Sequence, residues 1–175
     1  ETARCGEIVK NLLAFSRQSK INIESRDIKE IVDRTLTLLS HDLEMKGVQV
    51  VKHIDSHLPK VQCDFKQIQQ ALLNVIGNAS EAMTEGGGLI MTAKRSTEGR
   101  HMEIKISDTG CGIPKSHLKS IFEPFFTTKE EGKGVGLGLS VVYGIVTRHR
   151  GTIGVESEPG EGTTFTIHLP LALGN

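Results

Sequence analysis

The chain has 175 residues, with 21 basic and 21 acidic side chains, so it carries no net charge when its histidines are neutral. This balance excludes the strongly basic surface of a nucleic-acid-binding domain, and a hydrophobic content of 37% excludes a disordered charged tail. Glycine is in excess, with 19 residues that gather mostly between Gly77 and Gly162. The C-terminal half therefore needs backbone freedom or close backbone approach.

The N-terminal part of the chain is predicted to be helical. Residues 2–18 have a nearly heptad apolar stripe, which fits either a helical bundle or a helix packed on its own domain. Residues 19–26 are polar and are interpreted as a linker. Because the chain begins without Met inside a helical pattern, we expect a fragment of a longer protein. We divide it at residue 20, into a helix (1–20) and a domain (21–175).

Three main helices and a mixed sheet are predicted further along. The helices have 3.6-residue apolar periods or follow a glycine run, and they cover residues 28–45, 65–84 and 137–149. The strands alternate apolar and polar side chains or are short extended pieces, and they cover residues 48–54, 61–63, 89–94, 102–108, 152–156 and 163–169. A short helix is expected after Pro114. This order is typical of an α+β fold, a two-layer α/β sandwich, with the N-terminal helix added.

Two polar motifs carry possible chemistry. Asn74 and Asn78 are four residues apart, so their carboxamides share one helix face, where amide oxygens suit Mg²⁺. A solvated polar face without function explains this pair equally well. Asp108 ends a strand and is followed by Gly110 and Gly112. A carboxylate there can accept a hydrogen bond from the adenine amine and would repel the guanine carbonyl, although a capped tight turn is the simpler interpretation.

Glycines alternate at positions 134, 136 and 138, just before a predicted helix. Exposed backbone N–H groups at a helix N-terminus bind phosphate oxygens well. The spacing differs from the P-loop and from the dinucleotide-binding fingerprint. A flexible loop is the alternative.

Taken in order, these motifs resemble the ATP-binding domain of sensor histidine kinases, in the superfamily that also contains the gyrase, Hsp90 and MutL ATPases. The resemblance spans residues 27–170. It rests on an asparagine box (74–79), a first glycine box (108–114), a phenylalanine box (122–129), and further glycine boxes (132–140 and 160–165). The wording of the first and third boxes is closest to the nitrogen-regulation-like branch. Residues 4–17 resemble the second helix of the family's dimerisation hairpin, whose phosphoacceptor histidine is absent here.

The resemblance implies a Bergerat-type fold that binds ATP with Mg²⁺. It implies Asn78 as the metal ligand, Asp108 as the adenine reader, Thr163 beneath the base through a water, and a mobile lid over residues 125–136. The nucleotide-binding residues that it implies are Asn74, Asn78, Asp108, Gly110, Gly112, Thr127, Thr128, Lys129, Gly134, Val135, Gly136, Leu137, Gly138 and Thr163. No catalytic residue is expected within this chain.

Two departures from the family pattern matter. Many of these kinases carry Lys or Arg at the position of Glu81, so a phosphate contact from there is in doubt. The hydrolytic members have a Glu at the position of Asn74, and an amide cannot serve as a general base. Histidines have no metal-ligand spacing, and all but His41, which weakly imitates a phosphoacceptor box, are interpreted as surface residues, namely His53, His57, His101, His117, His149 and His168.

We therefore expect the kinase domain of a two-component sensor, which passes the ATP γ-phosphoryl group to a histidine outside this chain and then to a response regulator. Its expected partners are the receiver domain of that regulator and its own dimerisation hairpin, in a homodimer; no nucleic acid is expected. We expect a cytoplasmic domain whose parent could be membrane-bound. The alternatives are a hydrolytic ATPase of the same superfamily and a degenerate kinase that only binds a regulator.

Overall fold

The computed structural model describes residues 21–129 and 134–172, so the predicted helix over residues 2–18 lies outside the described part. Five strands form one mixed sheet in the order β2-β4-β5-β7-β6. Their bounds are β2 Val48–Ile54, β4 Gly87–Arg95, β5 His101–Asp108, β6 Thr152–Glu158 and β7 Gly162–Pro170. The β2–β4 pair is parallel, and the other three pairs are antiparallel.

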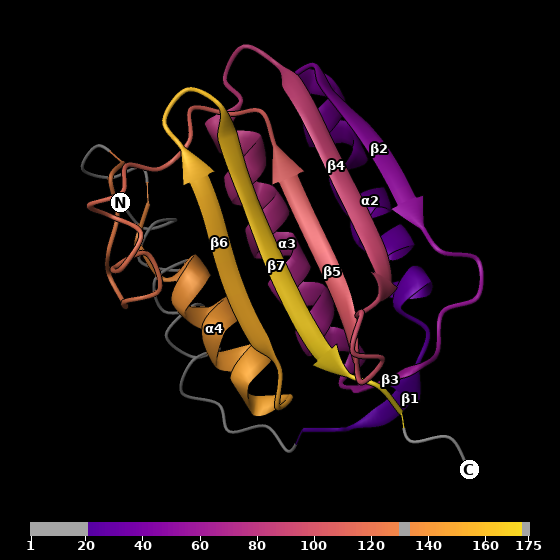
Figure 1. Ribbon diagram of the computed structural model, residues 1–175. Helices are drawn as coiled ribbons and strands as arrows, with labels where there is room; N and C mark the ends of the chain where they lie inside the picture. Colours follow the sequence, from indigo (N-terminus) through magenta and orange to yellow (C-terminus); the bar gives the residue numbers. More distant parts are fainter. Residues whose placement is uncertain (1–20, 130–133, 173–175) are drawn as a thin grey trace, which may run out of the picture.

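Three helices cover one face of this sheet, which confirms the predicted two-layer α/β sandwich (Figure 1). They are α2 Ile28–Met45, α3 Phe65–Ala82 and α4 Gly138–Arg148. Their apolar stripes meet the inward side chains of the strands: in β5, Met102, Ile104 and Ile106 are buried. This alternation is what a sheet with one covered face requires. None of the helices described has the length and apolarity needed to cross a bilayer.

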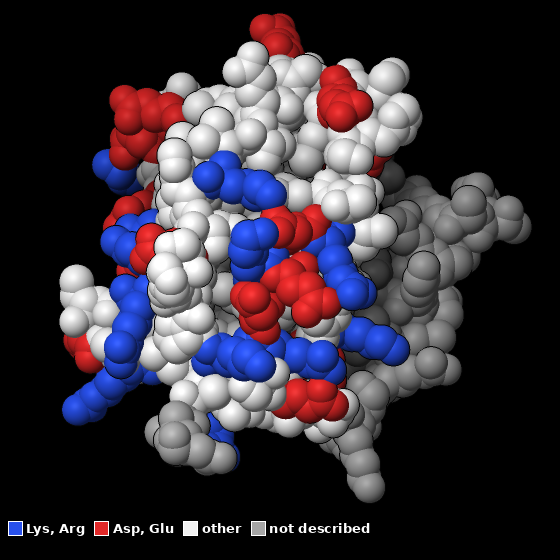
Figure 2. All heavy atoms as spheres, turned by 90° about the vertical axis from the view of Figure 1, so that its right-hand side faces the viewer, with Lys and Arg blue, Asp and Glu red and all other residues white. Residues whose placement is uncertain are grey.

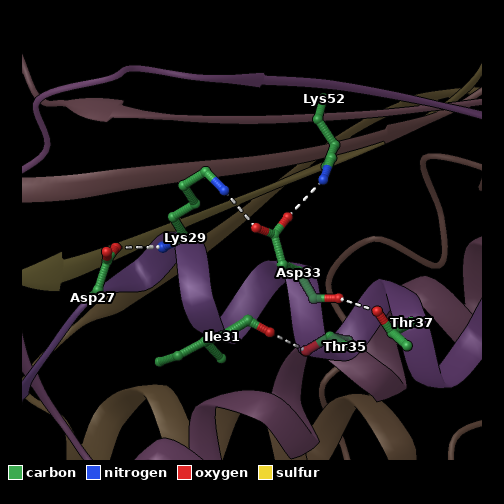
Figure 3. A network of polar contacts seen from close by, with 7 residues as sticks. All are labelled: Asp27, Lys29, Ile31, Asp33, Thr35, Thr37 and Lys52. Atoms are coloured by element: carbon green, nitrogen blue, oxygen red, sulfur yellow. Dashed lines mark hydrogen bonds and ion pairs between the residues drawn. The ribbon is translucent and has the colours of Figure 1, made fainter.

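The edge strand β2 is fastened to α2 by an ion-pair network. Asp33 of α2 accepts hydrogen bonds from Lys29 one turn earlier and from Lys52 of β2, each at 2.6 Å (Figure 3). These two bonds lower the pKa of Asp33. Figure 2 shows that basic and acidic side chains are interspersed on this side of the molecule. The charges here therefore pair with one another and do not form a field of one sign.

Two sequence predictions were wrong. Within residues 19–26, predicted as a linker, β1 Glu24–Arg26 pairs antiparallel with β3 Val61–Cys63. Three-residue strands are too short for their periodicity to be recognised. After Pro114 the chain forms hydrogen-bonded turns in place of the expected short helix: the N–H groups of His117 and Ser120 bond to carbonyls three residues earlier, and that of Ile121 bonds to the carbonyl of His117, four residues earlier.

His149, the C-cap of α4, joins the C-terminal end of α4 to the N-terminal end of α3. This side chain is 3% exposed, so its interpretation as a surface residue was wrong. Its Nδ1–H donates to the carbonyl of Ile145 at 2.7 Å, and its Nε2 accepts the backbone N–H of Asp64, the N-cap of α3, at 2.9 Å. Burial lowers the pKa of His149, because the interior disfavours the imidazolium form. The neutral tautomer therefore holds the two helices together.

Arg150 ends α4 in a left-handed conformation, with φ at 56°. Its N–H donates to the carbonyl of Thr147, and the N–H of Gly151 donates to that of Val146, which is the Schellman pattern of helix termination. This position normally belongs to glycine, because a Cβ is strained there.

Candidate nucleotide-binding site

One pocket of about 580 Å³ brings together residues from α3, the N-terminus of α4, the end of β5 and the start of β7. Thirteen of the fourteen predicted site residues line it. The exception is Gly110, which is buried and donates its N–H to Asp108 at 2.9 Å. Segments that are far apart in sequence therefore converge on one cavity.

Asp108, the last residue of β5, lines the pocket and is only 7% exposed. Its Oδ1 accepts the backbone N–H groups of Gly110, at 2.9 Å, and of Thr163, at 3.3 Å. Its Oδ2 forms no hydrogen bond with any residue that the structure describes, which leaves a fixed acceptor for a donor from a ligand. Burial raises the pKa of Asp108, and the two backbone hydrogen bonds partly oppose that rise.

Ser157 of β6 holds together the pocket wall formed by Ile113 and Thr163, and sequence reasoning missed it. Its Oγ accepts the N–H of Ile113 and donates to the carbonyl of Gly162, both at 2.8 Å. Because the Ser157 proton is used there, the Thr163 hydroxyl donates to Ser157, at 2.9 Å. The lone pairs of the Thr163 hydroxyl remain available as acceptors. A serine in a strand with alternating exposure gives no sequence signal for this role.

Gly112 allows the chain to fold tightly beside this wall. Its φ is 71°, and a Cβ built there would lie 2.2 Å from the carbonyl oxygen of Glu158 in the β6–β7 hairpin. Any side chain would therefore push the first glycine box away from the hairpin. Backbone atoms of Glu158 and Pro159 occupy the space where a side chain at position 112 would lie.

The two amides of α3 differ in their contacts. Asn74 is held at both ends: its Oδ1 accepts from Gln70 at 3.0 Å, and its Nδ2 donates to the carbonyl of Gly138 at 3.1 Å. The carboxamide of Asn78 has no hydrogen bond to any described residue, although it lines the same cavity. Asn74 thus ties α3 to the start of α4, and the oxygen of Asn78 is free for a ligand.

The N-terminus of α4 also lines the pocket. Its N-cap is Leu137, whose side chain cannot accept a hydrogen bond, so the first N–H groups of this helix have no side-chain cap. Gly136 has a φ of 71°, and a Cβ there would lie 2.6 Å from the Phe126 oxygen. The glycine therefore lets the chain pack against the phenylalanine box. The result is a set of backbone donors suited to an anion.

Lys129 lies across this part of the pocket. Its backbone N–H donates to the Thr127 hydroxyl at 3.2 Å, and its ammonium group forms an ion pair with Glu81 of α3. The predicted phosphate-binding lysine is thus paired with the residue at which the sequence departs from the family pattern.

The donor set fits a divalent cation that is carried with a ligand. Among the described residues there is no group of three or more His, Cys, Asp or Glu side chains that could hold a metal ion. The amide of Asn78, which has no hydrogen bond to a described residue, lines the pocket together with Gly138 at the uncapped start of α4. Mg²⁺ takes few protein ligands and keeps waters and phosphate oxygens, so this arrangement suits Mg²⁺ bound with a nucleotide.

Several lining residues were not predicted from the sequence. His117, interpreted as a surface residue, lines the pocket and packs edge-on against Phe126 at 5.5 Å between ring centroids. Cys111 and Ile113 also line it.

A mixed sheet covered on one face by three helices, with a pocket lined by a carboxylate, two amides and glycine loops, defines an ATPase domain of the two-layer sandwich type. Residues 63–173 match the family model described as histidine kinase-, DNA gyrase B-, and HSP90-like ATPase. The chain belongs to this family.

Its relatives are sensor kinases. The chain is 37% identical over 171 residues to the sensor histidine kinase ZraS of Escherichia coli K12, covering 98% of this chain and 36% of ZraS. It spans about a third or less of the first curated relatives. Among solved structures, full-length ShkA in complex with AMPPNP superposes with a TM-score of 0.84 at 30% identity, over 96% of this chain and 36% of that one. The histidine kinase ThkA in complex with the response regulator TrrA gives 0.81 at 26%, over 98% and 48%.

Proposed function

We propose that this domain binds Mg²⁺–ATP and presents its γ-phosphoryl group to a histidine outside the chain, as the kinase domain of a two-component sensor. The observation that carries the proposal is the convergence of separate segments on one pocket, which is lined both by the free amide of Asn78 and by the uncapped N-terminus of α4. The AMPPNP complex of ShkA, a relative in fold and sequence, supports ATP as the nucleotide.

Each residue then has a defined task. Asp108 accepts the exocyclic amine of adenine through its free Oδ2, and its fixed Oδ1 keeps the carboxylate oriented. The N–H groups at the start of α4 receive phosphate oxygens. Asn78 ligates Mg²⁺, which supplies charge neutralisation at the phosphates. Asn74 cannot activate water, because it is an amide and both of its ends are occupied. The bound nucleotide is therefore protected from hydrolysis within this chain.

The same proposal implies two partners of the domain. A receiver domain of a response regulator accepts the phosphoryl group in the full-length protein, as the ThkA–TrrA complex suggests by analogy. The dimerisation hairpin supplies the phosphoacceptor histidine and makes the full-length protein a homodimer. We propose that residues 1–20 belong to this hairpin and that residues 21–175 are the catalytic domain, on the cytoplasmic side.

Calorimetric titration with ATP and Mg²⁺ tests the proposal. Asn78→Ala should weaken binding at least tenfold, because the metal loses its protein ligand. Gln69→Ala is the matched control: it removes an amide from the same helix but does not line the pocket. Equal affinity of the wild type and Asn78→Ala would contradict the metal assignment. If the wild type does not bind ATP, the proposed function itself is wrong.

A further inference from the structure

The electrical charges around the pocket are unusual for a site that receives a polyanion. Among the described lining residues, Lys129 is the one cation with a permanent charge, whereas Glu81 and Asp108 are both acidic. The described lining therefore carries one positive and two negative charges when both carboxylates are ionised. Apart from the backbone N–H groups at the start of α4, phosphates that enter the site meet more negative than positive charge among its described side chains.

Glu81 is placed to act on the phosphates. Asn78 and Glu81 are three residues apart on α3, so they are neighbours on one helix face, and both line the pocket. Asp108 lies instead at the end of β5, and its Oδ1 is fixed to backbone N–H groups. Of the two acidic groups, Glu81 is therefore the one on the same helix face as the metal-binding amide.

Glu81 forms an ion pair with Lys129, the positively charged residue of the described lining. The Lys129 ammonium donates to Glu81 Oε2 across 48 residues of sequence. The lysine stem is confined as well, since a Cβ built at Gly134 would lie 2.9 Å from Lys129 Cδ. Both side chains are partly exposed, 38% for Lys129 and 49% for Glu81, so the pair can separate without burying a lone charge.

We infer that Glu81 is a specificity-determining residue that makes this site selective for nucleotide carrying a divalent cation. In the nucleotide-free state it neutralises Lys129, the cation that phosphates would otherwise find. When nucleotide arrives without metal, Glu81 repels its phosphates and competes for the lysine. When the phosphates arrive with Mg²⁺, the cation offsets this repulsion and Lys129 can move to a phosphate oxygen. The inference rests on the proposed function and deepens it.

The sign of the effect follows from electrostatics. Unit charges separated by a helix-face distance of roughly 6 Å interact appreciably at the effective dielectric of a protein surface, and the interaction falls when a counter-ion intervenes. Removing the Glu81 charge should therefore strengthen binding of metal-free ATP on the order of tenfold. The gain should be about threefold or less when Mg²⁺ is present. The ratio of the two dissociation constants is the measured quantity.

The test is titration of ATP into wild type, Glu81→Gln and Glu85→Gln, each with excess Mg²⁺ and with EDTA. Glu81→Gln keeps the shape of the side chain and removes its charge, and it should reduce the Mg²⁺ dependence of affinity several-fold. Glu85→Gln removes an exposed carboxylate of the following turn that does not line the pocket, and it should behave as wild type. An unchanged Mg²⁺ dependence in Glu81→Gln would overturn the inference.

A second ligand separates charge selection from general damage to the pocket. Adenosine has no phosphates, so its affinity should be the same in wild type and Glu81→Gln. A parallel change in adenosine binding would contradict the inference. Binding of Mg²⁺–ATP by the wild type, together with no effect of Glu81→Gln, would leave the proposed function standing and refute the role of Glu81 alone.

Discussion

Asp108→Asn should separate nucleotide recognition from stability. Asparagine is nearly isosteric, and its Oδ1 can still accept the N–H groups of Gly110 and Thr163. Its NH₂ group would replace Oδ2, so the acceptor that faces the ligand becomes a donor. The adenine amine would then meet another donor, whereas the guanine carbonyl would find a partner.

The magnitude follows from the hydrogen bond that is lost. A bond to a charged acceptor contributes roughly 1.5–3 kcal/mol, and each 1.4 kcal/mol is a factor of ten, so ATP affinity should fall about 10- to 100-fold. GTP affinity should rise.

The stability of the folded protein should not fall in Asp108→Asn, although its ATP affinity does. Because the folded pKa of Asp108 is raised, the folded state favours the protonated form, and this contribution is present at low pH and lost as pH rises through the folded pKa. At neutral pH the ionised carboxylate is therefore a cost that asparagine removes.

Titration calorimetry with ATP and GTP, together with thermal melting of the nucleotide-free protein at pH 7.5, measures both effects. Retained preference for ATP in Asp108→Asn would refute the adenine assignment. A melting temperature lowered by several degrees would show that the carboxylate is needed for folding, and the argument from its pKa would be wrong.

Three further predictions concern stability and reactivity. Arg150→Gly should stabilise the fold by about 1 kcal/mol in denaturant melts, since glycine adopts the left-handed conformation without strain; an unchanged midpoint would contradict this. The wild type should lose stability as pH falls below about 6.5, because the unfolded chain protonates His149 more readily than the folded one. His149→Gln should be less stable than the wild type at pH 7.5, but it should lose less stability on acidification. ATP should slow the alkylation of exposed Cys111, which peptide mass spectrometry can map. Buried Cys63 should stay unlabelled with or without ATP, because burial raises the pKa of its thiol to about 12. Equal labelling of Cys111 in both conditions would argue against its place in the site.

The elements with strong periodicity were predictable from the sequence. Helix α3 begins after its Asp64 cap, and β5 alternates as expected, since both patterns depend on neighbours within a few residues. What the sequence could not predict depends on distant partners. The burial of His149 depends on Asp64, 85 residues away, and the pairing of Lys129 with Glu81 depends on how α3 approaches the phenylalanine box.

The residues that line the pocket were anticipated through the resemblance of the ordered motifs to a known family, because each motif taken alone had a simpler interpretation. Ser157 was not anticipated, since its three hydrogen bonds arise only when β6 and β7 turn back beside the first glycine box. The contrast between Asn74 and Asn78 also needed the structure: the two amides look equivalent on a helix face, and the hydrogen bonds of Asn74 to Gln70 and Gly138 distinguish them.

The two bonds that join α3 and α4 have a mechanical consequence. One lies near the start of α4, from Asn74 to Gly138, and the other lies just beyond its end, from Asp64 to His149. A helix fastened at both ends can neither pivot nor slide independently of its neighbour. The pair should behave as one stiff bracket, and adjustment to an arriving nucleotide should fall to the turn-rich chain after Pro114. Hydrogen exchange should then change with ATP in that chain and stay constant along α4 beyond its first turn.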